Sequence, residues 1–404
     1  MTEVQSVVPA GAAAADADAS ARFDKVAARA LEVGLRRVTV LAWRDLDDPE
    51  AGGSELHAHQ LATIWAGGGL DVTLRTSATP GLPAVTQRDG YRVVRRAGRI
   101  GVFPRSILGT LLPPGARPDG LMEVWHGIPF YAPVWARCPL VSFVHHVHAD
   151  TWKILLPPAM ARVGAMLELK VAPPLYRKTR FVTPSNSTRD DVVKMLRADP
   201  ALVTVAPNGV HPRFSPGGER SADPLVVAVG RLVPVKRFGM LIDALARVRE
   251  RVPTLRALIV GDGFTRPKLE AKAAAAGAGA WLEMPGHLSD DELLDVYRRA
   301  WVLASTSRRE GWNMTITEAA ACGTPAVATN IVGHRDTVAH DVSGLLASPG
   351  DDFVGALTRL LEDDALRRRL GQGAVERARA FRWEATAATT LEALVEEAEA
   401  RRAR

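Results

Sequence analysis

The chain has 404 residues, 47% of them hydrophobic, with 51 Lys and Arg against 45 Asp and Glu. A chain of this length is too long to fold around one hydrophobic core, so it predicts a globular protein of two domains. Two distant cysteines argue against a disulfide framework, whereas the formal charge of +6 leaves nucleic acid, an anionic membrane and phosphorylated small molecules open as partners.

The first twenty residues, MTEVQSVVPAGAAAADADAS, hold three acidic side chains, no basic start and no compact apolar run. They predict a flexible tail rather than a signal peptide. No stretch of the sequence reaches the roughly 18 uninterrupted apolar residues that span a bilayer. We therefore expect a cytoplasmic protein.

Short β-branched runs alternate with helical patterns along most of the chain. The clearest runs are VTVLAW from Val38, DVTLRT from Asp71, LVSFVH from Leu140, RFVTPS from Arg180, LVVAVG from Leu225, LRALIVG from Leu255 and TPAVATN from Thr324. Such alternation predicts crossover units and parallel sheets that are buried on both faces.

The segment APNGVHPRFSPGGERSADP, between Val205 and Leu225, interrupts this pattern with Pro, Gly, Asn and Ser. It predicts a link between two α/β domains, each doubly wound and Rossmann-like, that face each other across a cleft. We expect a tail and leading helix over residues 1–36, domains over 37–212 and 213–384, and a helix over 385–404 that returns to the first domain. Ligands of such sheets bind at the carboxyl ends of the strands.

Two motifs of the first domain could carry chemistry. Gly52 and Gly53 follow the first strand and would let backbone N–H groups approach a diphosphate, although a plain strand-to-helix turn also needs glycine. SFVHHVHAD contains His145, His146 and His148. A zinc site is disfavoured, because this spacing on a strand places the rings on both faces and no Cys or HExxH partner is near.

In the second domain, VGRLVPVKRFG places Arg231 after a strand and Lys236 before an amphipathic helix. Two cations beside a helix N-terminus suit a phosphate or diphosphate, although they could also be solvated loop charges. EMPGHLSDDEL would bring the backbone of Gly286, His287 and Leu288 close to a ligand ahead of a helix.

SRREGWNMTITEAAACGTP places Glu310 before a helix and Glu318 inside it, in its first turn. A carboxylate only accepts hydrogen bonds, so two carboxylates facing one cleft suit the vicinal hydroxyls of a sugar and of a ribose.

Together these motifs resemble glycosyltransferase family 4, the retaining nucleotide-sugar transferases of GT-B architecture. AGGSELHAHQLA, APNGV, GRLVPVK, GDG, the Glu310–Glu318 spacing, EAAACGTPAVAT and FRWE occur in the expected order over almost the whole chain. The resemblance implies an acceptor-binding first domain and a nucleotide-sugar-binding second domain.

The resemblance also implies roles for single residues. Glu310 would contact the transferred sugar, Glu318 the ribose, and Arg231 and Lys236 the diphosphate. The catalytic set would be His145, Glu310, Arg231 and Lys236, and the donor-binding set would add Gly53, Gly286, His287, Leu288, Asn313, Met314, Thr315 and Glu318. The family usually has glycine where this chain has Asn313, and often where it has Arg237.

The expected reaction moves a hexose from a UDP- or GDP-sugar to a glycan, lipid-linked or small-molecule hydroxyl, with retention and with no metal or cofactor. A non-catalytic sugar-nucleotide-binding protein and a GT-B epimerase or phosphorylase stay as alternatives. No nucleic-acid recognition module is evident. RVVRRAGRIGVFPR and TWKILLPPAMARVGAMLELK mix basic and apolar residues and suit peripheral contact with an anionic membrane, or a core-facing helix with a solvated basic side.

Overall fold

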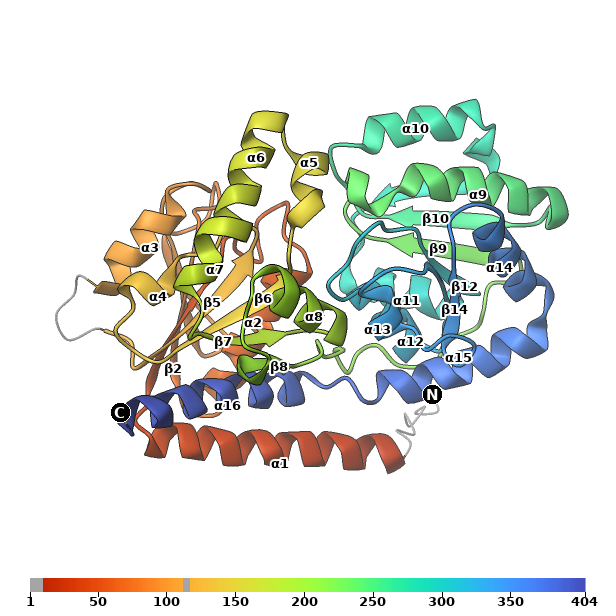
Figure 1. The fold of residues 1–404 in the computed structure, drawn as a ribbon. Coiled ribbons are helices and arrows are strands. Elements are labelled where there is room, and N and C mark those ends of the chain that lie inside the picture. Colours follow the sequence, from red (N-terminus) through yellow and green to blue (C-terminus); the bar gives the residue numbers. More distant parts are fainter. Residues whose placement is uncertain (1–9, 112–116, 404) are drawn as a thin grey trace.

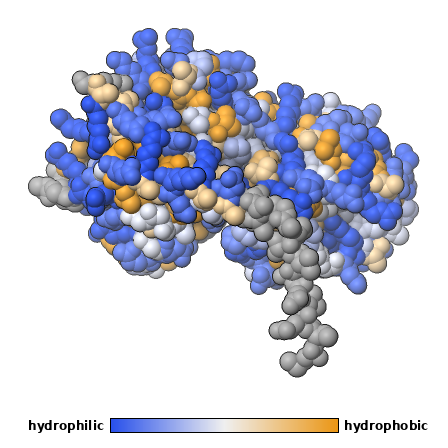
Figure 2. Space-filling view, turned by 90° about the horizontal axis from the view of Figure 1, so that it is seen from below, coloured by the Kyte–Doolittle hydropathy of each residue, from blue (hydrophilic) through white to orange (hydrophobic). Residues whose placement is uncertain are grey.

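A computed structural model describes residues 10–111 and 117–403, and it consists of two α/β lobes, each built on one sheet (Figure 1). None of the helices in these two ranges is long and apolar enough to cross a bilayer. Figure 2 shows the lobes from below, where hydrophilic side chains cover most of the visible surface. This architecture is the GT-B arrangement that the sequence predicts.

The first sheet has eight strands in the order β3-β4-β2-β1-β5-β6-β7-β8. Its strands are β1 (Arg37–Leu41), β2 (Asp71–Thr76), β3 (Val85–Arg88), β4 (Tyr91–Arg95), β5 (Gly120–His126), β6 (Leu140–His146), β7 (Arg180–Thr183) and β8 (Val203–Val205). Its helices are α1 (Ala10–Glu32), α2 (Gly53–Gly67), α3 (Val102–Leu111), α4 (Ala132–Trp135), α5 (Trp152–Leu155), α6 (Pro158–Met166), α7 (Ala172–Leu175) and α8 (Asn186–Met195).

The second sheet has six parallel strands in the order β11-β10-β9-β12-β13-β14. Its strands are β9 (Leu225–Val229), β10 (Arg256–Val260), β11 (Leu282–Gly286), β12 (Val302–Ser305), β13 (Ala326–Thr329) and β14 (Gly344–Ala347). Its helices are α9 (Phe238–Arg251), α10 (Arg266–Ala275), α11 (Asp290–Arg299), α12 (Met314–Ala321), α13 (His334–Thr337), α14 (Asp351–Glu362) and α15 (Asp364–Ala378), and α16 (Trp383–Arg402) follows. The short 3-10 helices are η1 (Ala149–Thr151), η3 (Pro200–Leu202), η4 (Pro234–Lys236) and η5 (Ala278–Ala280), and η2 (Leu167–Val171) is a π-helix.

Both sheets reverse their strand order at one point, which positions the site. The first sheet turns at β1, between β2 and β5, and the second turns at β9, between β10 and β12. At such a switch point the loops diverge to opposite faces and leave a crevice at the carboxyl ends of the strands. The loops after β1, β9 and β12 therefore carry the residues that can meet a ligand.

One part of the first sheet differs from the prediction of parallel strands. β3 pairs with β4 in antiparallel register through the turn Asp89–Gly90, where φ is +42° and +86°. Asp-Gly flanked by β-branched residues is a hairpin signal that the sequence contains. β4 then pairs in parallel with β2, so this hairpin closes one edge of the sheet.

The expected flexible tail is wrong for residues 10–20, which belong to helix α1, while residues 1–9 lie outside the described ranges. Alanine has the highest intrinsic helix propensity, and α1 is rich in it. α1 packs along α16, where Arg29 binds Glu399 with 2.6 Å between nitrogen and oxygen (Figure 1). Packing against α16 therefore adds stability that an isolated helix does not have in water.

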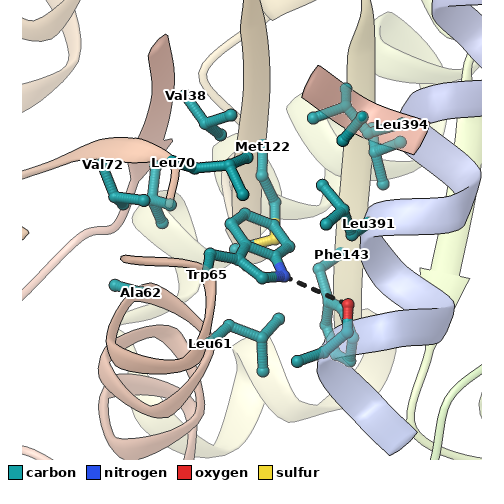
Figure 3. Packing of buried hydrophobic residues seen from close by; sticks show 14 of the residues in the cluster. Val38, Leu61, Ala62, Trp65, Leu70, Val72, Met122, Phe143, Leu391 and Leu394 are labelled. Atoms are coloured by element: carbon teal, nitrogen blue, oxygen red, sulfur yellow. Dashed lines mark hydrogen bonds between the residues drawn. The ribbon is translucent and has the colours of Figure 1, made fainter. Parts of the chain in front are cut away.

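Helix α16 returns from the second lobe to the first, as the sequence predicts. Leu391 and Leu394 enter the core that β1, β2 and α2 form, and Trp65 lies at its centre with no exposed surface (Figure 3). The indole Nε1 of Trp65 donates to the carbonyl of Ala387 at 3.1 Å, so the tryptophan also satisfies its own polar atom.

The chain passes between the lobes twice, and the two passages pair. The backbone N–H of Val210 donates to the carbonyl of Phe381 at 3.1 Å. Val210, Phe381 and Trp312 form a small buried cluster there. The predicted domain boundary at 212/213 lies in the connection between β8 and β9 and stays a prediction.

Candidate functional site

The loop after β9 and the loop after β12 meet through an ion pair. Lys236, the last residue of η4, donates from Nζ to Oε1 of Glu310 at 2.7 Å. Ser307 Oγ donates to the same oxygen at 2.6 Å. Burial alone would raise the pKa of Glu310, but the charge of Lys236 and these hydrogen bonds lower it below its usual value. Glu310 is therefore a carboxylate held by two donors.

The guanidinium of Arg231 lies near this pair, and it has no hydrogen bond or ion pair to any residue that the structure describes. Burial lowers the pKa of Arg231, and the charge of Arg44 from the first domain lowers it further, while Glu55, Glu50 and Glu310 oppose them. The N–H groups of an unpaired guanidinium can donate hydrogen bonds to an anion.

The glycines of the first domain face these residues from across the interface. A Cβ atom on Gly52 would lie 3.5 Å from Nε of Arg231, and one on Gly53 would lie 3.1 Å from Sδ of Met314. Glu55 fixes this loop, because its carboxylate accepts from the N–H of Gly52 at 2.9 Å and from Nε of Arg44 at 3.1 Å. The structure thus brings Gly53 and Met314, both predicted site residues, together.

Asn313, which stands where the family usually has glycine, has an ordinary extended backbone with φ of −127°. Its amide Nδ2 donates to Oγ of Ser305 at 3.0 Å and lies 3.1 Å from Nε2 of His334. His334 Nδ1 lies 2.7 Å from the carbonyl of Thr329, which can only accept, so Nδ1 carries the proton and Nε2 accepts. A buried side-chain network therefore shapes this loop.

Thr315 completes the start of helix α12, because its Oγ1 donates to Oδ1 of Asn313 at 2.8 Å. Burial lowers the pKa of His334 to about 4, which keeps the ring neutral at pH 7 and preserves its role as acceptor. The first turn of α12 begins at Met314, whose side chain lies near Gly53 while Arg231 lies near Gly52, so the N-terminus of this helix lies close to Arg231.

Glu318 is the fifth residue of α12, one position beyond the predicted first turn. Tyr297 OH donates to its Oε2 at 2.9 Å. Burial raises the pKa of Glu318 to about 7, and the bond from Tyr297 only partly offsets this. At neutral pH the carboxyl group of Glu318 is therefore partly protonated, and a further hydrogen-bond donor would favour its ionised form.

The histidines at the end of β6 separate into two environments. The ring of His145 lies 4.8 Å from that of His57 and only 7% of its surface is exposed, so burial lowers its pKa to about 3. His146 senses the charges of Glu310, Arg309, Arg231 and Lys236, although burial lowers its pKa to about 4. Of the two, His146 thus lies nearer the charges of Glu310 and Lys236, and His145 packs against His57 and Phe143 of its own domain.

His148 and His126 extend this group toward the first domain. The ring of His146 stacks on His148 at 4.3 Å, and His126 meets His148 edge-on at 5.1 Å. Among the described residues no group of three His, Cys, Asp or Glu side chains has a geometry that could hold a metal ion. These imidazoles instead form a neutral, aromatic wall.

The predicted base-binding residues lie at the end of β11. Gly286 has φ of +87°, and its carbonyl accepts from the N–H of Gly261 at 2.8 Å. His287 is exposed and Leu288 packs against the core cluster of β9 and β12. The turn therefore presents one polar ring and backbone groups at the same sheet edge as Arg231.

The two domains touch directly next to Glu310. A Cβ atom on Gly311 would lie 1.7 Å from the carbonyl oxygen of His145, so only glycine allows this approach. Ser185 Oγ donates to the carbonyl of Gly311 at 2.8 Å, and Arg309 forms an ion pair with Asp191 of α8. These contacts fix the loop of Glu310 against the first domain.

Several of these residues were not predicted from the sequence. No role was assigned from the sequence to Ser307, Tyr297, His334, Asp191, Ser185 or His57, although His57 and Ser307 lie within recognised motifs. They support side chains that were predicted. Ser307 had a signal in the sequence, since it lies three residues before Glu310, and so did His57, which lies in AGGSELHAHQLA.

Comparison with known sequences covers both domains. The family model for Glycosyltransferase Family 4 matches residues 51–214, and that for Glycosyl transferases group 1 matches residues 213–377. A D-inositol 3-phosphate glycosyltransferase of Streptomyces bingchenggensis is 30% identical over 93% of this chain and 91% of its own. One from Stackebrandtia nassauensis is 31% identical over 88% of this chain and 90% of its own.

Solved structures share the fold at lower identity. Sucrose-phosphate synthase from Thermosynechococcus elongatus superposes with a TM-score of 0.74 at 20% identity, covering 87% of this chain and 96% of its own. Anabaena Alr3699/HepE in complex with UDP-glucose gives 0.68 at 19% identity, covering 91% and 100%. With two sheets that reverse at facing switch points and relatives that match along nearly its whole length, the chain belongs to glycosyltransferase family 4.

Proposed function

We propose that this glycosyltransferase moves a hexose from a UDP-sugar to a hydroxyl acceptor, with retention of the anomeric configuration and without a metal ion. The observation that carries the proposal is the convergence of Arg231, Lys236 and Glu310 beside the first turn of α12. UDP is favoured over GDP because Anabaena Alr3699/HepE, which has the same fold, is described in complex with UDP and with UDP-glucose.

In this proposal the cations hold the diphosphate. Lys236 is neutralised by Glu310, whereas the guanidinium of Arg231 has no ion pair with any residue that the structure describes. An incoming diphosphate would attract both cations, and sugar hydroxyls would then donate to the freed oxygen of Glu310. When the glycosidic bond to the diphosphate breaks, negative charge grows on the β-phosphate, and fixed cations stabilise that charge.

The remaining donor residues follow from the same geometry. Ribose hydroxyls would donate to Glu318, the base would rest at Gly286, His287 and Leu288, and the N–H groups from Asn313 to Thr315 would bind phosphate. The acceptor would enter from the side of the first domain, on the face of the sugar that the leaving phosphate occupies. Contact between the domains would exclude water that would otherwise hydrolyse the donor.

The acceptor is proposed to be a polyhydroxylated molecule that meets the imidazole wall of His126, His146 and His148. Relatives that are about 30% identical carry the name D-inositol 3-phosphate glycosyltransferase, which favours a small, phosphorylated polyol. Glycan and lipid-linked hydroxyls are compatible with the same wall.

We also propose peripheral contact with an anionic membrane. Helix α6 exposes Met160, Val163 and Met166, at three-residue spacing, with Arg162 and Lys170 exposed nearby. Such a stripe suits the headgroup boundary of a bilayer. Sedimentation with anionic vesicles is expected to decrease in a Met160→Ser/Met166→Ser variant, and equal sedimentation of both proteins would contradict this placement.

The experiment that tests the donor site measures UDP-glucose consumption and UDP affinity in Arg231→Ala, Lys236→Ala and Glu310→Ala. Each variant is expected to lose about 10² to 10³ in rate, because each removes a group aimed at the leaving phosphate or the sugar. The alanine variants of the two cations should also bind UDP more weakly, whereas Glu310→Ala should not, because Glu310 faces the sugar.

Arg247→Ala is the matched control, since this exposed arginine of α9 is paired with Asp351 away from the site. Full transfer by the Arg231→Ala and Lys236→Ala variants would contradict the assignment of the diphosphate. His145→Ala and His146→Ala separate the two histidines: a larger loss in kcat for His146→Ala is expected from its place beside Glu310 and Lys236.

A further inference from the structure

The arginines around the β3–β4 hairpin fall into two groups. Arg88, Arg95 and Arg99 are each paired with carboxylates of the loop after β1, namely Asp45, Asp47, Asp48 and Glu50. The other four in this region have no ion pair with any residue that the structure describes; they are Arg75, Arg92, Arg96 and Arg105. Three of these arginines are thus neutralised by carboxylates, whereas no described carboxylate neutralises the other four.

These four arginines line one cavity of about 290 Å³. Arg92 and Val94 alternate along β4 and share one face, Arg96 directly follows the strand, and Arg75 of β2 stands opposite Val94 in the register. Helix α3 covers this face and contributes Arg105, Ser106 and Gly109. Burial lowers the pKa of Arg75, and the charges of Arg92 and Arg105 lower it further, which shows that the cations are close.

Arg75 is fixed in the wall of this cavity. Its NH2 group donates to the carbonyl of Gly109 at 2.7 Å, while its Nε is buried without a hydrogen-bond partner. A Cβ atom on Gly109 would lie 2.6 Å from NH1 of Arg75, so a glycine inside α3 makes room for the guanidinium. Glycine destabilises the interior of a helix, so Gly109 lowers the stability of α3 and in return allows the close contact with Arg75.

We propose that this four-arginine pocket binds the phosphate group of a phosphorylated ligand. Guanidinium groups donate in pairs to phosphate oxygens, and a dianion offsets the mutual repulsion of cations that lack carboxylates. The volume is near the lower limit for small-molecule sites, roughly 300 Å³, so it suits a phosphate with a small organic group rather than a nucleotide. None of its lining residues belongs to the proposed donor site.

The phosphate could come from a soluble phosphate ester or from a lipid headgroup, and one pair of variants tests both. Arg92→Gln/Arg96→Gln removes two exposed cations of the pocket. Arg247→Gln/Arg251→Gln removes two exposed cations of α9 and matches the loss of charge. Calorimetric titration with glycerol 3-phosphate is done with UDP in excess, so that the donor site is occupied, and flotation uses phosphatidylglycerol or phosphatidylcholine vesicles.

At least tenfold weaker binding of glycerol 3-phosphate by the pocket variant, with unchanged binding by the control, supports a soluble ester. Loss of flotation with phosphatidylglycerol in the pocket variant alone supports a headgroup. Equal behaviour of the two variants, or no binding of either probe by the wild-type protein, overturns the proposal. UDP-glucose affinity is measured in parallel, because its absence in the wild-type protein would count against the donor site and not against this pocket.

Discussion

Glu318 combines deep burial with a proposed role, binding of ribose hydroxyls, that needs a charge. Tyr297 donates a hydrogen bond to its carboxylate, and burial raises its pKa to about 7. A carboxylate surrounded by ribose hydroxyls would gain donors and so return toward its ionised form. If Glu318 binds the ribose as proposed, part of the binding energy would be spent on shifting its protonation equilibrium.

This shift predicts how pH affects stability. The pKa of Glu318 rises from 4.5 in the unfolded chain to about 7, so its contribution is complete below pH 4.5 and is lost as the pH rises to 7. That interval corresponds to about 3 kcal/mol. Glu318→Gln is expected to gain about this much relative to the wild-type protein between pH 4.5 and pH 8, measured by urea unfolding.

Glu123 needs a separate variant, because burial also raises its pKa to about 7 and it titrates in the same interval. Glu123→Gln should show the same gain in stability relative to the wild-type protein. Addition of UDP should reduce only the pH-dependent loss of stability that comes from Glu318. A Glu318→Gln variant whose stability follows the wild-type pH profile would show that the carboxylate is ionised in the free protein.

At the scale of elements, the loops after β9 and β12 stabilise each other. Arg237, where the family often has glycine, has φ of +52°, in the left-handed region. Its Nε donates to the carbonyl of Thr306 at 2.8 Å and its NH2 to that of Ser307 at 3.1 Å. The side chain thus compensates for a backbone conformation that costs about 1 kcal/mol for a residue with a Cβ.

Two substitutions at this position separate backbone from side chain. Both Arg237→Gly and Arg237→Ala lose the charge-assisted bonds, about 1.5 to 3 kcal/mol, but only glycine relieves the backbone. The order of stability is expected to be wild type, then glycine, then alanine, with about 1 kcal/mol between the last two in chemical denaturation. Equal stability of the two variants would mean that the left-handed conformation is not maintained in solution.

At the scale of the whole molecule, the two domains meet where the chemistry is proposed. Gly311 contacts the carbonyl of His145, Ser185 binds Gly311, and Arg309 binds Asp191, all within a few residues of Glu310. Because these contacts join the domains at the site itself, the distance between domains and the position of Glu310 are coupled.

Gly311→Ala tests this coupling, since its Cβ cannot fit 1.7 Å from the carbonyl oxygen of His145. The domains must separate or the loop must shift, and a displacement of about 1 Å is expected to lower transfer about 100-fold while UDP still binds the second domain. Small-angle scattering should show a larger radius of gyration. Gly355→Ala, in open space on α14, is the control and should remain fully active.

The sequence alone determined the fold class and the places along the chain where the residues of the proposed donor site lie. Each of the β-branched runs it identified overlaps a strand of the structure, because strands buried on both faces need continuous apolar sequence. Arg231, Lys236, Glu310 and Met314 follow strands or begin helices at a switch point, so local sequence suffices to place them.

Only the tertiary structure decided how these residues are held and what surrounds them. The contacts of Glu310 with Lys236, of Asn313 with His334 and of Gly311 with His145 join segments 21 to more than 150 residues apart, and no local pattern encodes such pairs. The same holds for the four-arginine pocket, where β2, β4 and α3 converge. Burial and neighbouring charge, which set each pKa and each free donor, arise only after the chain has folded.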